Sequence, residues 1–427
     1  MANVLDILKR RGFIYQTTNE SELSKRFDNP TTFYIGFDPT ADSLHVGHLL
    51  PIMGAMWLRM HGHKAIMVIG GGTAMIGDPS GKTTARPILD KETVKSNSKA
   101  IYAQLQGLFK EQFGLYDPIL LNNAGWVSSM TFIDFIRDIG SQFSVPRMLA
   151  QESMRKRLET GLSFLEFSYP LMQAYDFLTL FQVYGCTVQF GGQDQWGNMV
   201  GGIDLIHRKT GGDAYAATFP LLLKSDGTKF GKTAGDAVWL DESRTSVFDY
   251  YQFWRNTDDK DVKRMLALFT MLPMDEVERL GSLEPPMLNR AKEILAYEAT
   301  AFVHGHEKAI RAYKTAGNMF GFADPEKTVQ TTSEIMNDDG IDGNDAPTMM
   351  AIELTPENSE DGKIFLYKVL VMSGMCNSAS DARRLIKQGG CYMGGRRVTD
   401  EKQVVSKSAL SFELQAGKKS RKRILLI

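Results

Sequence analysis

The feature that most constrains the fold is an alternation, in the first half of the chain, between short strand-like runs and longer helical patterns. The runs TTFYIGF, KAIMVIGG, DPILLNN and CTVQFGG are rich in β-branched, aromatic and other apolar residues. Strands that alternate with helices form a parallel sheet covered by helices, so we predict an α/β fold. Each run ends in Gly, Asn or Asp residues, and ligands of such sheets bind beyond those ends. We expect the four loops to converge on one crevice.

The rest of the chain divides into three further parts, since 427 residues exceed what one hydrophobic core supports. After a first domain over residues 1–247, apolar positions repeat with a helical period over residues 248–323, which predicts an all-helical domain. Residues 324–361 hold eleven acidic residues and one lysine without periodicity, as expected of an acidic linker. Residues 362–427 predict a helix, a glycine turn and two strands in a small α+β module.

Charge is distributed unevenly along the chain. The formal net charge is -1 and 43% of the residues are apolar, which does not mark the whole molecule as a nucleic-acid or membrane protein. Residues 383–427, however, hold twelve basic and three acidic residues. This excess favours a polyanion partner, RNA or DNA, over a merely solvated surface. The candidate contacts are Arg383, Arg384, Lys387, Arg396, Arg397, Lys418 and Lys419.

Cysteine usage and hydropathy bear on the compartment. Cys186, Cys376 and Cys391 are dispersed and form no C-x-x-C pair, so neither a disulfide framework nor a structural zinc site is supported. The N-terminal segment lacks an apolar signal core, and no run of 18 or more apolar residues occurs. We therefore expect a cytoplasmic protein that does not bind a membrane.

Two histidines stand three residues apart in the segment FDPTADSLHVGHLLP. With Asp42 or Ser43 as the N-cap of a helix, His45 and His48 lie on one face of its first turn. A helix N-terminus attracts phosphate, and imidazoles there donate hydrogen bonds to phosphate oxygens. Pro51 fits best where the regular helix begins just before it or bends. The alternatives are a metal pair, for which no third ligand lies at usual spacing, and two solvated histidines.

Two further segments carry candidate site residues. The loop KSDGTKFGKTAGD has the composition of a mobile loop that closes over a phosphate chain, although its spacing is not that of a Walker sequence. Its alternative is a solvated basic loop. In SYPLMQAYDF, Tyr169, Gln173 and Asp176 fall on one helical face. This polar stripe either binds a polar small ligand or braces neighbouring loops.

Together these segments resemble the tyrosyl-tRNA synthetases of the bacterial type. HVGH at residues 45–48 matches the HIGH signature of class I aminoacyl-tRNA synthetases, and KFGKT at residues 229–233 stands where that class has its KMSKS loop. YIGFDPTADSLHVGHL, FSYPLMQAYDF, GGQDQWGN and DGTKFGKT are similar to the tyrosine-specific branch, in its order and spacing. The C-terminal piece is similar to a small RNA-binding module shared with a small-subunit ribosomal protein and pseudouridine synthases. The resemblance implies a Rossmann-like catalytic domain followed by helical and RNA-binding domains.

The resemblance implies two steps, activation of tyrosine with ATP to tyrosyl-adenylate and transfer of tyrosine to the 3′ end of tRNA(Tyr). Catalysis then comes from positioning and from donors aimed at the charge on pyrophosphate. The catalytic residues it implies are Thr40, His45, His48, Lys82, Arg86, Lys229, Lys232 and Thr233. Those near the nucleoside, the adenylate or the tyrosine carboxylate are Asp38, Gly47, Gly192, Asp194, Gln195 and, again, Lys232.

For tyrosine, the resemblance places Tyr34 and Asp176 at the phenolic hydroxyl. A site built to bond that hydroxyl leaves both groups unpaired when phenylalanine enters, a principle for which this enzyme family is itself the standard example. Asp78, Tyr169 and Gln173 are implied as ammonium ligands, and Asn123 as a further tyrosine contact. Two departures from the family pattern are Gln193 and Ile35, and Ile35 removes a side-chain hydrogen bond to ribose, so we expect an altered ATP affinity.

The partners that the resemblance implies are L-tyrosine, ATP with Mg²⁺ as co-substrate, tRNA(Tyr) and a second copy of the chain. No tightly bound cofactor and no protein metal site are expected. The apolar segment FIDFIRDIGSQF serves either the homodimer or the core. Two other functions stay open at this point, activation of another substrate, chiefly tryptophan or a cofactor precursor, and an RNA-binding scaffold with little activity. Tyr34 with Asp176 argues against the first, and the intact motif set against the second.

Overall fold

The structure is a computed structural model of the chain. It describes residues 3–80, 89–113, 118–223, 225, 227, 230–233, 236–337, 349–352, 355, 359, 363–393, 396–406, 412–417 and 420–426. Two compact units are present, the first made of residues 1–309 with 329–335, the second of residues 310–328 with 336–427. The four-part division expected from the sequence stays a prediction. Among the described residues, no helix is both long and apolar enough to cross a bilayer.

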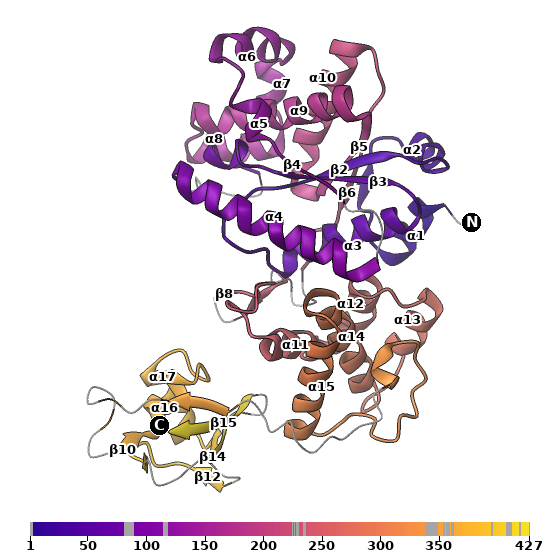
Figure 1. The fold of residues 1–427 in the computed structure, drawn as a ribbon. Coiled ribbons are helices and arrows are strands. Elements are labelled where there is room, and N and C mark those ends of the chain that lie inside the picture. Colours follow the sequence, from indigo (N-terminus) through magenta and orange to yellow (C-terminus); the bar gives the residue numbers. More distant parts are fainter. Residues whose placement is uncertain are drawn as a thin grey trace. The chain divides into compact units, whose positions relative to one another are not determined.

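The first unit is built on a six-stranded sheet with the order β1-β6-β5-β2-β3-β4 (Figure 1). Its strands are β1 Gln16–Thr17, β2 Thr32–Phe37, β3 Lys64–Ile69, β4 Ile119–Asn122, β5 Cys186–Gly192 and β6 Tyr215–Phe219. All neighbours pair in parallel except β1, which is antiparallel to β6. The four strand-like runs of the sequence are β2, β3, β4 and β5, so the predicted parallel sheet is confirmed.

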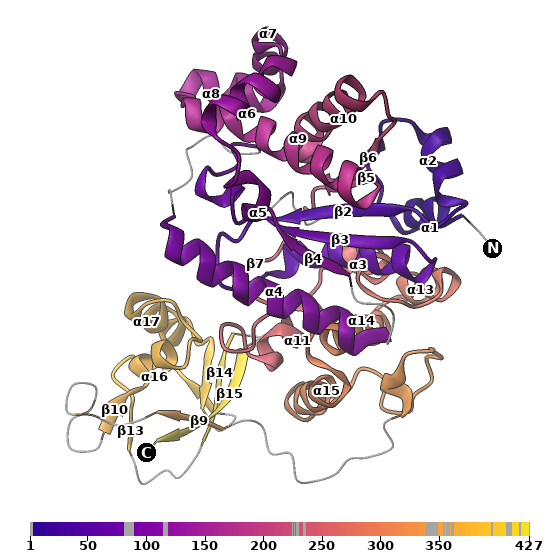
Figure 2. The same cartoon turned by 45° about the horizontal axis from the view of Figure 1, so that its top comes forward.

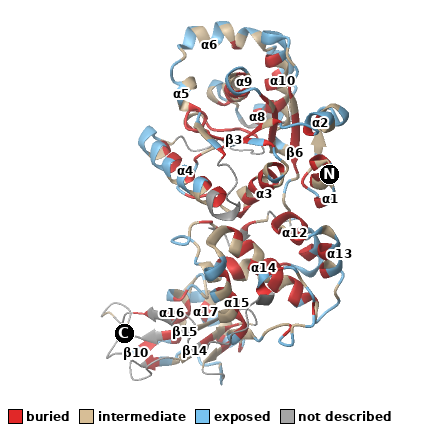
Figure 3. Ribbon diagram, turned by 45° about the vertical axis from the view of Figure 1, so that its right-hand side comes forward, coloured by how far each residue is buried: buried red, intermediate tan, exposed pale blue. Residues whose placement is uncertain are grey.

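Helices cover both faces of this sheet. On one face lie α3 Val46–Met60 and α4 Lys91–Phe113, and on the other α9 Phe164–Tyr184 and α10 Trp196–Thr210 (Figures 1 and 2). The remaining helices around the sheet are α1 Val4–Arg11, α2 Glu20–Phe27, α5 Ala124–Val127, α6 Phe132–Asp138, α7 Val145–Leu149 and α8 Glu152–Thr160. Burial is concentrated on the strands and on the inner helix faces (Figure 3), because runs such as Ile66–Val68 are apolar on both sides.

A helical region follows the sheet, as its sequence period predicts. Its helices are α11 Val247–Arg255, α12 Val262–Phe269, α13 Met274–Gly281, α14 Leu288–His304 and α15 His306–Phe320. Tyr250, Tyr251 and Trp254 are fully buried in its core. Arg290 is fully buried as well, and its guanidinium lies 3.1 Å from the Glu293 carboxylate, so the charge is paired where no water reaches it.

The C-terminal part of the second unit is α+β, as predicted. Its elements are β9 Met349–Ile352, β10 Lys363–Phe365, α16 Leu366–Met372, α17 Ala379–Lys387, β11 Cys391–Met393, β12 Arg396–Val398, β13 Val404–Ser406, β14 Phe412–Ala416 and β15 Ser420–Leu426. Five strands form a sheet of order β12-β11-β14-β15-β9, and β10 pairs with β13. Strand β9 comes from the predicted acidic linker and pairs in parallel with β15, so this part of the segment belongs to the module's sheet.

Candidate active site

A cavity of about 400 Å³ lies beyond the carboxyl ends of the strands. Loops after β2, β3, β4 and β5 line it, as do the N-terminus of α3 and one face of α9, so the predicted convergence is confirmed. The predicted site residues that line it are Tyr34, Asp38, Thr40, Gly47, His48, Asp78, Asn123, Tyr169, Gln173, Asp176, Gly192, Asp194 and Gln195. Ile35 also lines it, as a buried apolar wall.

Some predicted site residues lie elsewhere. His45 is absent from the cavity wall, and its ring stacks on His48 with centroids 4.0 Å apart. Lys82, Arg86 and Lys229 lie outside the described residues, as do Lys418 and Lys419. Lys232 and Thr233 form the short strand β7, of which the backbone is described.

The N-terminus of α3 differs from the sequence expectation. Its N-cap is His45, which has an extended backbone, and neither Asp42 nor Ser43 caps the helix. The helix begins at Val46, so Pro51 stands inside it and has no amide to donate to the carbonyl of Gly47. The reason is tertiary, because the chain before Val46 is held extended by pairing with a later segment.

The later segment comes from the loop that carries Lys232. Strands β7 Lys232–Thr233 and β8 Asp236–Ala237 form a hairpin. Beyond it, the amide of Val46 donates to the carbonyl of Val238 at 2.9 Å, and the amide of Leu240 donates to the carbonyl of Leu44 at 2.8 Å. These bonds dock the hairpin beside the first turn of α3. The two basic motifs of the sequence are therefore neighbours in the structure.

Backbone amides fix how the two histidines present their protons. The amide of Gly47 donates to Nδ1 of His45 at 3.0 Å, and the amide of His45 donates to Nδ1 of His48 at 3.2 Å. An imidazole nitrogen that accepts a hydrogen bond carries no proton, so each ring holds its proton on Nε2 when neutral. A Cβ on Gly47 would lie 2.7 Å from Cε1 of His45, so glycine is needed there to admit the ring.

Asp176 is a buried carboxylate of α9 that lines the cavity. Nδ2 of Asn123 donates to its Oδ2 at 2.9 Å, and Nε1 of Trp126 donates to its Oδ1 at 2.7 Å. Burial raises the pKa of Asp176 to about 7, against these two hydrogen bonds, which lower it. The hydroxyl of Tyr34 is buried in the same cavity, and no described residue bonds it. Burial, and then the charge of Asp176, raise the Tyr34 pKa well above its ordinary value.

Two more carboxylates face the cavity. Asp38 accepts from the Thr73 hydroxyl at 2.9 Å and from the Tyr169 hydroxyl at 2.9 Å. Asp78 accepts from the amide of Ser80 at 2.9 Å, and burial raises its pKa to about 6. The negative charge of Asp38 raises the pKa of Asp78 and the pKa of Asp176 further. With Asp194, four carboxylates line the cavity, and their negative charge favours a cation there.

A chain of side-chain amides connects the loop after β5 to α9. Gln195 donates to Asp78 at 2.7 Å and accepts from Asn198 at 3.1 Å, and Asn198 also donates to Oε1 of Gln173 at 3.0 Å. Each bond consumes donor or acceptor capacity, which fixes the orientation of the amides. The polar stripe of α9 therefore has partners on neighbouring elements, so the bracing interpretation is confirmed. The stripe also lines the cavity, and its binding of a small ligand stays a prediction.

Sequence reasoning assigned no individual role to Thr73, Trp126 or Asn198. Thr73 stands in the loop after KAIMVIGG and Asn198 stands in GGQDQWGN, whereas nothing around Trp126 signals its bond to Asp176. It also missed the role of Gly70, where a Cβ would lie 2.1 Å from Oδ1 of Asp38. Within the described part of the chain, no three His, Cys, Asp or Glu side chains gather in the manner of a metal site.

The predicted tRNA contacts of the second unit have different local partners. The guanidinium of Arg383 lies over the Tyr367 ring at 4.1 Å, Arg384 pairs with Asp381 at 2.8 Å, and Lys387 lies 3.2 Å from Glu401. Arg397 donates to the backbone carbonyls of Gly389 at 2.8 Å and Gln388 at 3.2 Å, so it fixes the turn after α17. Arg396 is exposed on β12.

Comparison with known proteins identifies the family of the chain. A family model described as tRNA synthetases class I (W and Y) matches residues 25–321, and an S4 domain model matches residues 366–410. A tyrosine–tRNA ligase of Clostridium botulinum is 46% identical over 94% of this chain and 93% of that protein. One from Desulfatibacillum aliphaticivorans is 46% identical over 99% of both chains.

Among solved structures, a C-terminally truncated mitochondrial tyrosyl-tRNA synthetase of Aspergillus nidulans has a TM-score of 0.68 and 31% identity. The match covers 75% of this chain and 95% of that one. The fold, the cavity and these relatives agree, and the chain belongs to the tyrosine–tRNA ligases, a family of class I tRNA synthetases.

Proposed function

We propose that the residues of this cavity carry out the tyrosine–tRNA ligation that membership of the family assigns to the chain. The observation that carries the assignment of residues is the buried Tyr34 hydroxyl, which no described residue bonds, in the same cavity as Asp176. A phenolic hydroxyl satisfies both groups, because it accepts from Tyr34 and donates to Asp176. Asn123 and Trp126 hold that carboxylate in place.

The ammonium group of tyrosine is bound by the polar set around Asp78. Its carboxylate, the Tyr169 hydroxyl oxygen and Oε1 of Gln173 are acceptors, which is what a cation with three N–H donors requires. Asp38 draws the Tyr169 proton toward itself, so the oxygen lone pairs of that hydroxyl stay available to the ligand. A bound ammonium also lowers the repulsion among the carboxylates.

In the first step, a tyrosine carboxylate oxygen bonds to the α-phosphorus of ATP while the bond to the bridging oxygen breaks and pyrophosphate leaves. His48 lines the cavity, and its Nε2–H is aimed by the backbone bond to Nδ1. Thr40, His45, Lys82, Arg86, Lys229, Lys232 and Thr233 are proposed to bind the phosphates, where charge grows. Gly47, Gly192, Asp194 and Gln195 are proposed to contact the nucleoside and the tyrosine carboxylate. Mg²⁺ is proposed to arrive on the ATP phosphates and to neutralise part of their charge.

In the second step, a ribose hydroxyl of tRNA attacks the activated carbonyl and AMP leaves. The S4 domain is proposed to hold the tRNA through α17, whose Arg383, Arg384 and Lys387 are exposed to the solvent. The ion pairs of Arg384 with Asp381 and of Lys387 with Glu401 exchange readily with phosphates because solvent screens them. In K387E, tRNA affinity should fall and the salt dependence of binding should become less steep, since one phosphate contact is lost. A tRNA affinity unchanged in this variant would exclude that contact.

A second copy of the chain is the proposed partner of an apolar patch in the first unit. The patch is proposed to consist of the exposed apolar side chains of α6, α7, α8 and the start of α9, namely Phe132 (65% exposed), Ile133 (68%), Val145 (52%), Leu158 (49%) and Phe164 (67%). In the FIDFIRDIGSQF segment, Ile139 and Phe135 face the core, while Phe132 and Ile133 do not. Exposed apolar clusters of this kind mark interfaces.

Sedimentation velocity tests the proposed homodimer. The wild type should sediment as a dimer at micromolar concentration, and Ile133→Asp as a monomer, because a buried unpaired charge weakens an interface. The matched control is Tyr15→Asp, since Tyr15 is 53% exposed outside the patch. A monomeric wild type, or an equal effect of both changes, would exclude the patch.

We also propose a cytoplasmic location, which the three free cysteines support because a reducing compartment keeps thiols free.

ATP–pyrophosphate exchange tests the residue assignments. Purified protein should exchange with tyrosine and not with phenylalanine, tryptophan or no amino acid. Lys232→Ala should lower the exchange rate while sparing tyrosine binding, because its proposed contact forms on the leaving group. Lys64→Ala, at the exposed start of β3, is the matched control. Exchange with another amino acid would overturn the tyrosine pocket, and weakened tyrosine binding in Lys232→Ala would overturn the role of that lysine.

A further inference from the structure

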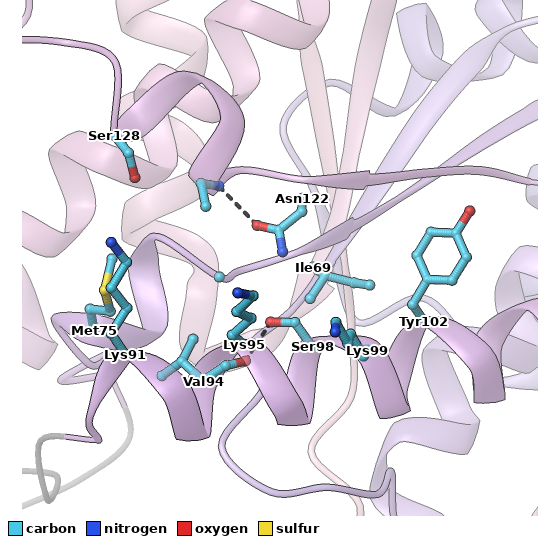
Figure 4. A pocket seen from close by; sticks show the side chains of 12 residues that line it. Ile69, Met75, Lys91, Val94, Lys95, Ser98, Lys99, Tyr102, Asn122 and Ser128 are labelled. Carbon is cyan, nitrogen blue, oxygen red and sulfur yellow. Dashed lines mark hydrogen bonds between the residues drawn. The ribbon is translucent and has the colours of Figure 1, made fainter.

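A second cavity of about 440 Å³ lies between α4 and the ends of β3 and β4 (Figure 4). Its apolar floor comes from Ile69, Met75 and Val94, and its remaining lining residues are Gly71, Lys91, Lys95, Ser98, Lys99, Tyr102, Asn122, Ala124 and Ser128. None of the residues proposed to bind tyrosine or ATP lines it. Its volume lies in the range of small-molecule sites.

Three lysines of α4 border this cavity. Lys91, Lys95 and Lys99 are four residues apart, so they project from one face of the helix, toward the strand ends in the case of Lys91 and Lys95 (Figure 4). No carboxylate is among the described residues that line the cavity, and in that same part of the chain no ion pair is formed by these lysines. Like charges at this spacing destabilise a helix slightly. Solvation of the lysine side chains explains their exposure, but it does not explain why a row of positive charges borders a cavity with an apolar floor.

The polar groups of the cavity are mainly donors. Oδ1 of Asn122 accepts from the amide of Ala124 at 2.9 Å, so its Nδ2 donors remain, and Figure 4 shows that nitrogen on the side of α4. The Tyr102 ring is 42% exposed at one end of the lysine row and offers a face for stacking. Three ammonium groups, an amide and an aromatic ring over an apolar floor match a ligand with an anionic group on an apolar, preferably aromatic, body.

We propose that this cavity is a second ligand site, for a small aromatic or aliphatic anion such as an organic phosphate, and that its occupancy is linked to tyrosine binding. The link follows from shared walls. Gly71 lines this cavity, while its neighbours Gly70 and Thr73 line the active site. Asn122 lines this cavity, and the adjacent Asn123 bonds Asp176 in the active site. A ligand that displaces the ends of β3 and β4 therefore displaces wall residues of both cavities.

Helix α4 gives a second route between the two cavities. On its inner side, Asn97 donates to the carbonyl of Pro39 at 3.1 Å, and Gln104 accepts from the amide of Leu44 at 2.8 Å. Both contacts lie in the loop that leads into the N-cap of α3. The helix therefore bears the lysine row on one side and braces the active-site loop on the other. The site lies apart from the residues proposed for tyrosine activation, and its existence does not depend on their roles.

Pyridoxal 5′-phosphate is a suitable probe because it is an aromatic phosphate with an aldehyde. The aldehyde condenses with a lysine amine and releases water, and added borohydride reduces the imine to a stable secondary amine. With the active site filled by tyrosyl-adenylate, peptide mapping should find Lys91, Lys95 or Lys99 modified at least tenfold faster than Lys64, which is exposed at the start of β3. Equal rates at all four lysines would overturn the proposed site.

Binding without borohydride tests the site and its link separately. The affinity of the full chain for the probe should fall at least fivefold in Lys95→Glu and should stay unchanged in the control Lys64→Glu. Equilibrium dialysis should show a tyrosine Kd that changes at least threefold when the probe saturates the wild type, and does not change in Lys95→Glu. Linkage requires that tyrosine change the probe Kd by the same factor. A probe affinity insensitive to Lys95→Glu overturns the site, and a constant tyrosine Kd overturns the link.

Discussion

Replacing Asp176 by asparagine should stabilise the fold while it removes tyrosine activation. The carboxylate is buried, and burial raises its pKa from 3.8 to about 7. Because the folded pKa lies above the unfolded one, the folded state binds more protons between these two values. Stability that is present below about pH 4 is therefore lost as the pH rises toward 7. Asparagine does not titrate, so it avoids that loss.

The size of the effect follows from the same values. A difference of about three pH units at 1.36 kcal/mol each gives about 4 kcal/mol above pH 7. Asparagine offers one oxygen, so it keeps the bond from either Asn123 or Trp126 and loses the other, at about 1–2 kcal/mol. We expect Asp176→Asn to raise the free energy of unfolding by about 2–3 kcal/mol at pH 8. At pH 5 we expect no change or a small decrease.

Urea unfolding of wild type and Asp176→Asn at pH 5 and pH 8 measures this difference. Asp241→Asn is the matched control, since the bonds from Ser243 lower the Asp241 pKa and its titration falls below this window. The free energy of unfolding of Asp241→Asn, relative to that of the wild type, should not change between pH 5 and 8. If the same difference for Asp176→Asn did not change either, the Asp176 carboxylate would not titrate near neutral pH, and the reasoning from burial would be wrong. Pyrophosphate exchange with tyrosine should be lost in the same variant.

Three further outcomes follow from the site. Trp126→Phe should weaken tyrosine binding by roughly tenfold in equilibrium dialysis, since it removes a hydrogen bond to a buried carboxylate; Trp57→Phe is the control, because the indole N–H of Trp57 has no partner among the described residues. Gly70→Ala should abolish exchange, since its Cβ would meet a carboxylate oxygen at 2.1 Å, whereas Gly107→Ala has open space and should not. Tyrosine affinity should fall roughly tenfold per pH unit below about pH 6, where Asp78 gains a proton and no longer attracts the ammonium group. A tyrosine affinity that does not change with pH in this range would exclude Asp78 as an ammonium ligand.

The parallel sheet was predictable because its signal is local. Each core strand is an apolar run bounded by polar residues, and parallel strands are buried on both faces, so β2, β3 and β5 are visible without knowledge of their partners. The loops that end these strands were predictable for the same reason. Their convergence follows from the sheet's geometry, since all carboxyl ends of parallel strands lie at one edge.

The start of α3 was not predictable, because a distant segment decides it. Local propensity favours Asp42 or Ser43 as the N-cap. The bonds of Leu44 and Val46 with residues 238–240 keep the chain extended as far as His45, and tertiary contacts outweigh a preference of about 1 kcal/mol. Strand β9 was missed likewise, because its partner β15 is far along the sequence and the segment around it is acidic.

Two of the site residues that sequence reasoning found share a property that Trp126 lacks. Asp176 and Tyr34 are polar groups in an apolar core, and such conflicts between local chemistry and burial persist where a ligand resolves them. Trp126 carries no conflict of its own, since its ring packs against the core and its indole N–H bonds Asp176, and its role appears only with the fold. The lysine row of α4 is a conflict of the same kind at a second cavity, where like charges border an apolar floor and no carboxylate is among the described lining residues. The criterion that selects the proposed tyrosine pocket therefore selects this cavity as well. An anion there would relieve repulsion among the lysines, as a bound ammonium group is proposed to do among the carboxylates of the active site.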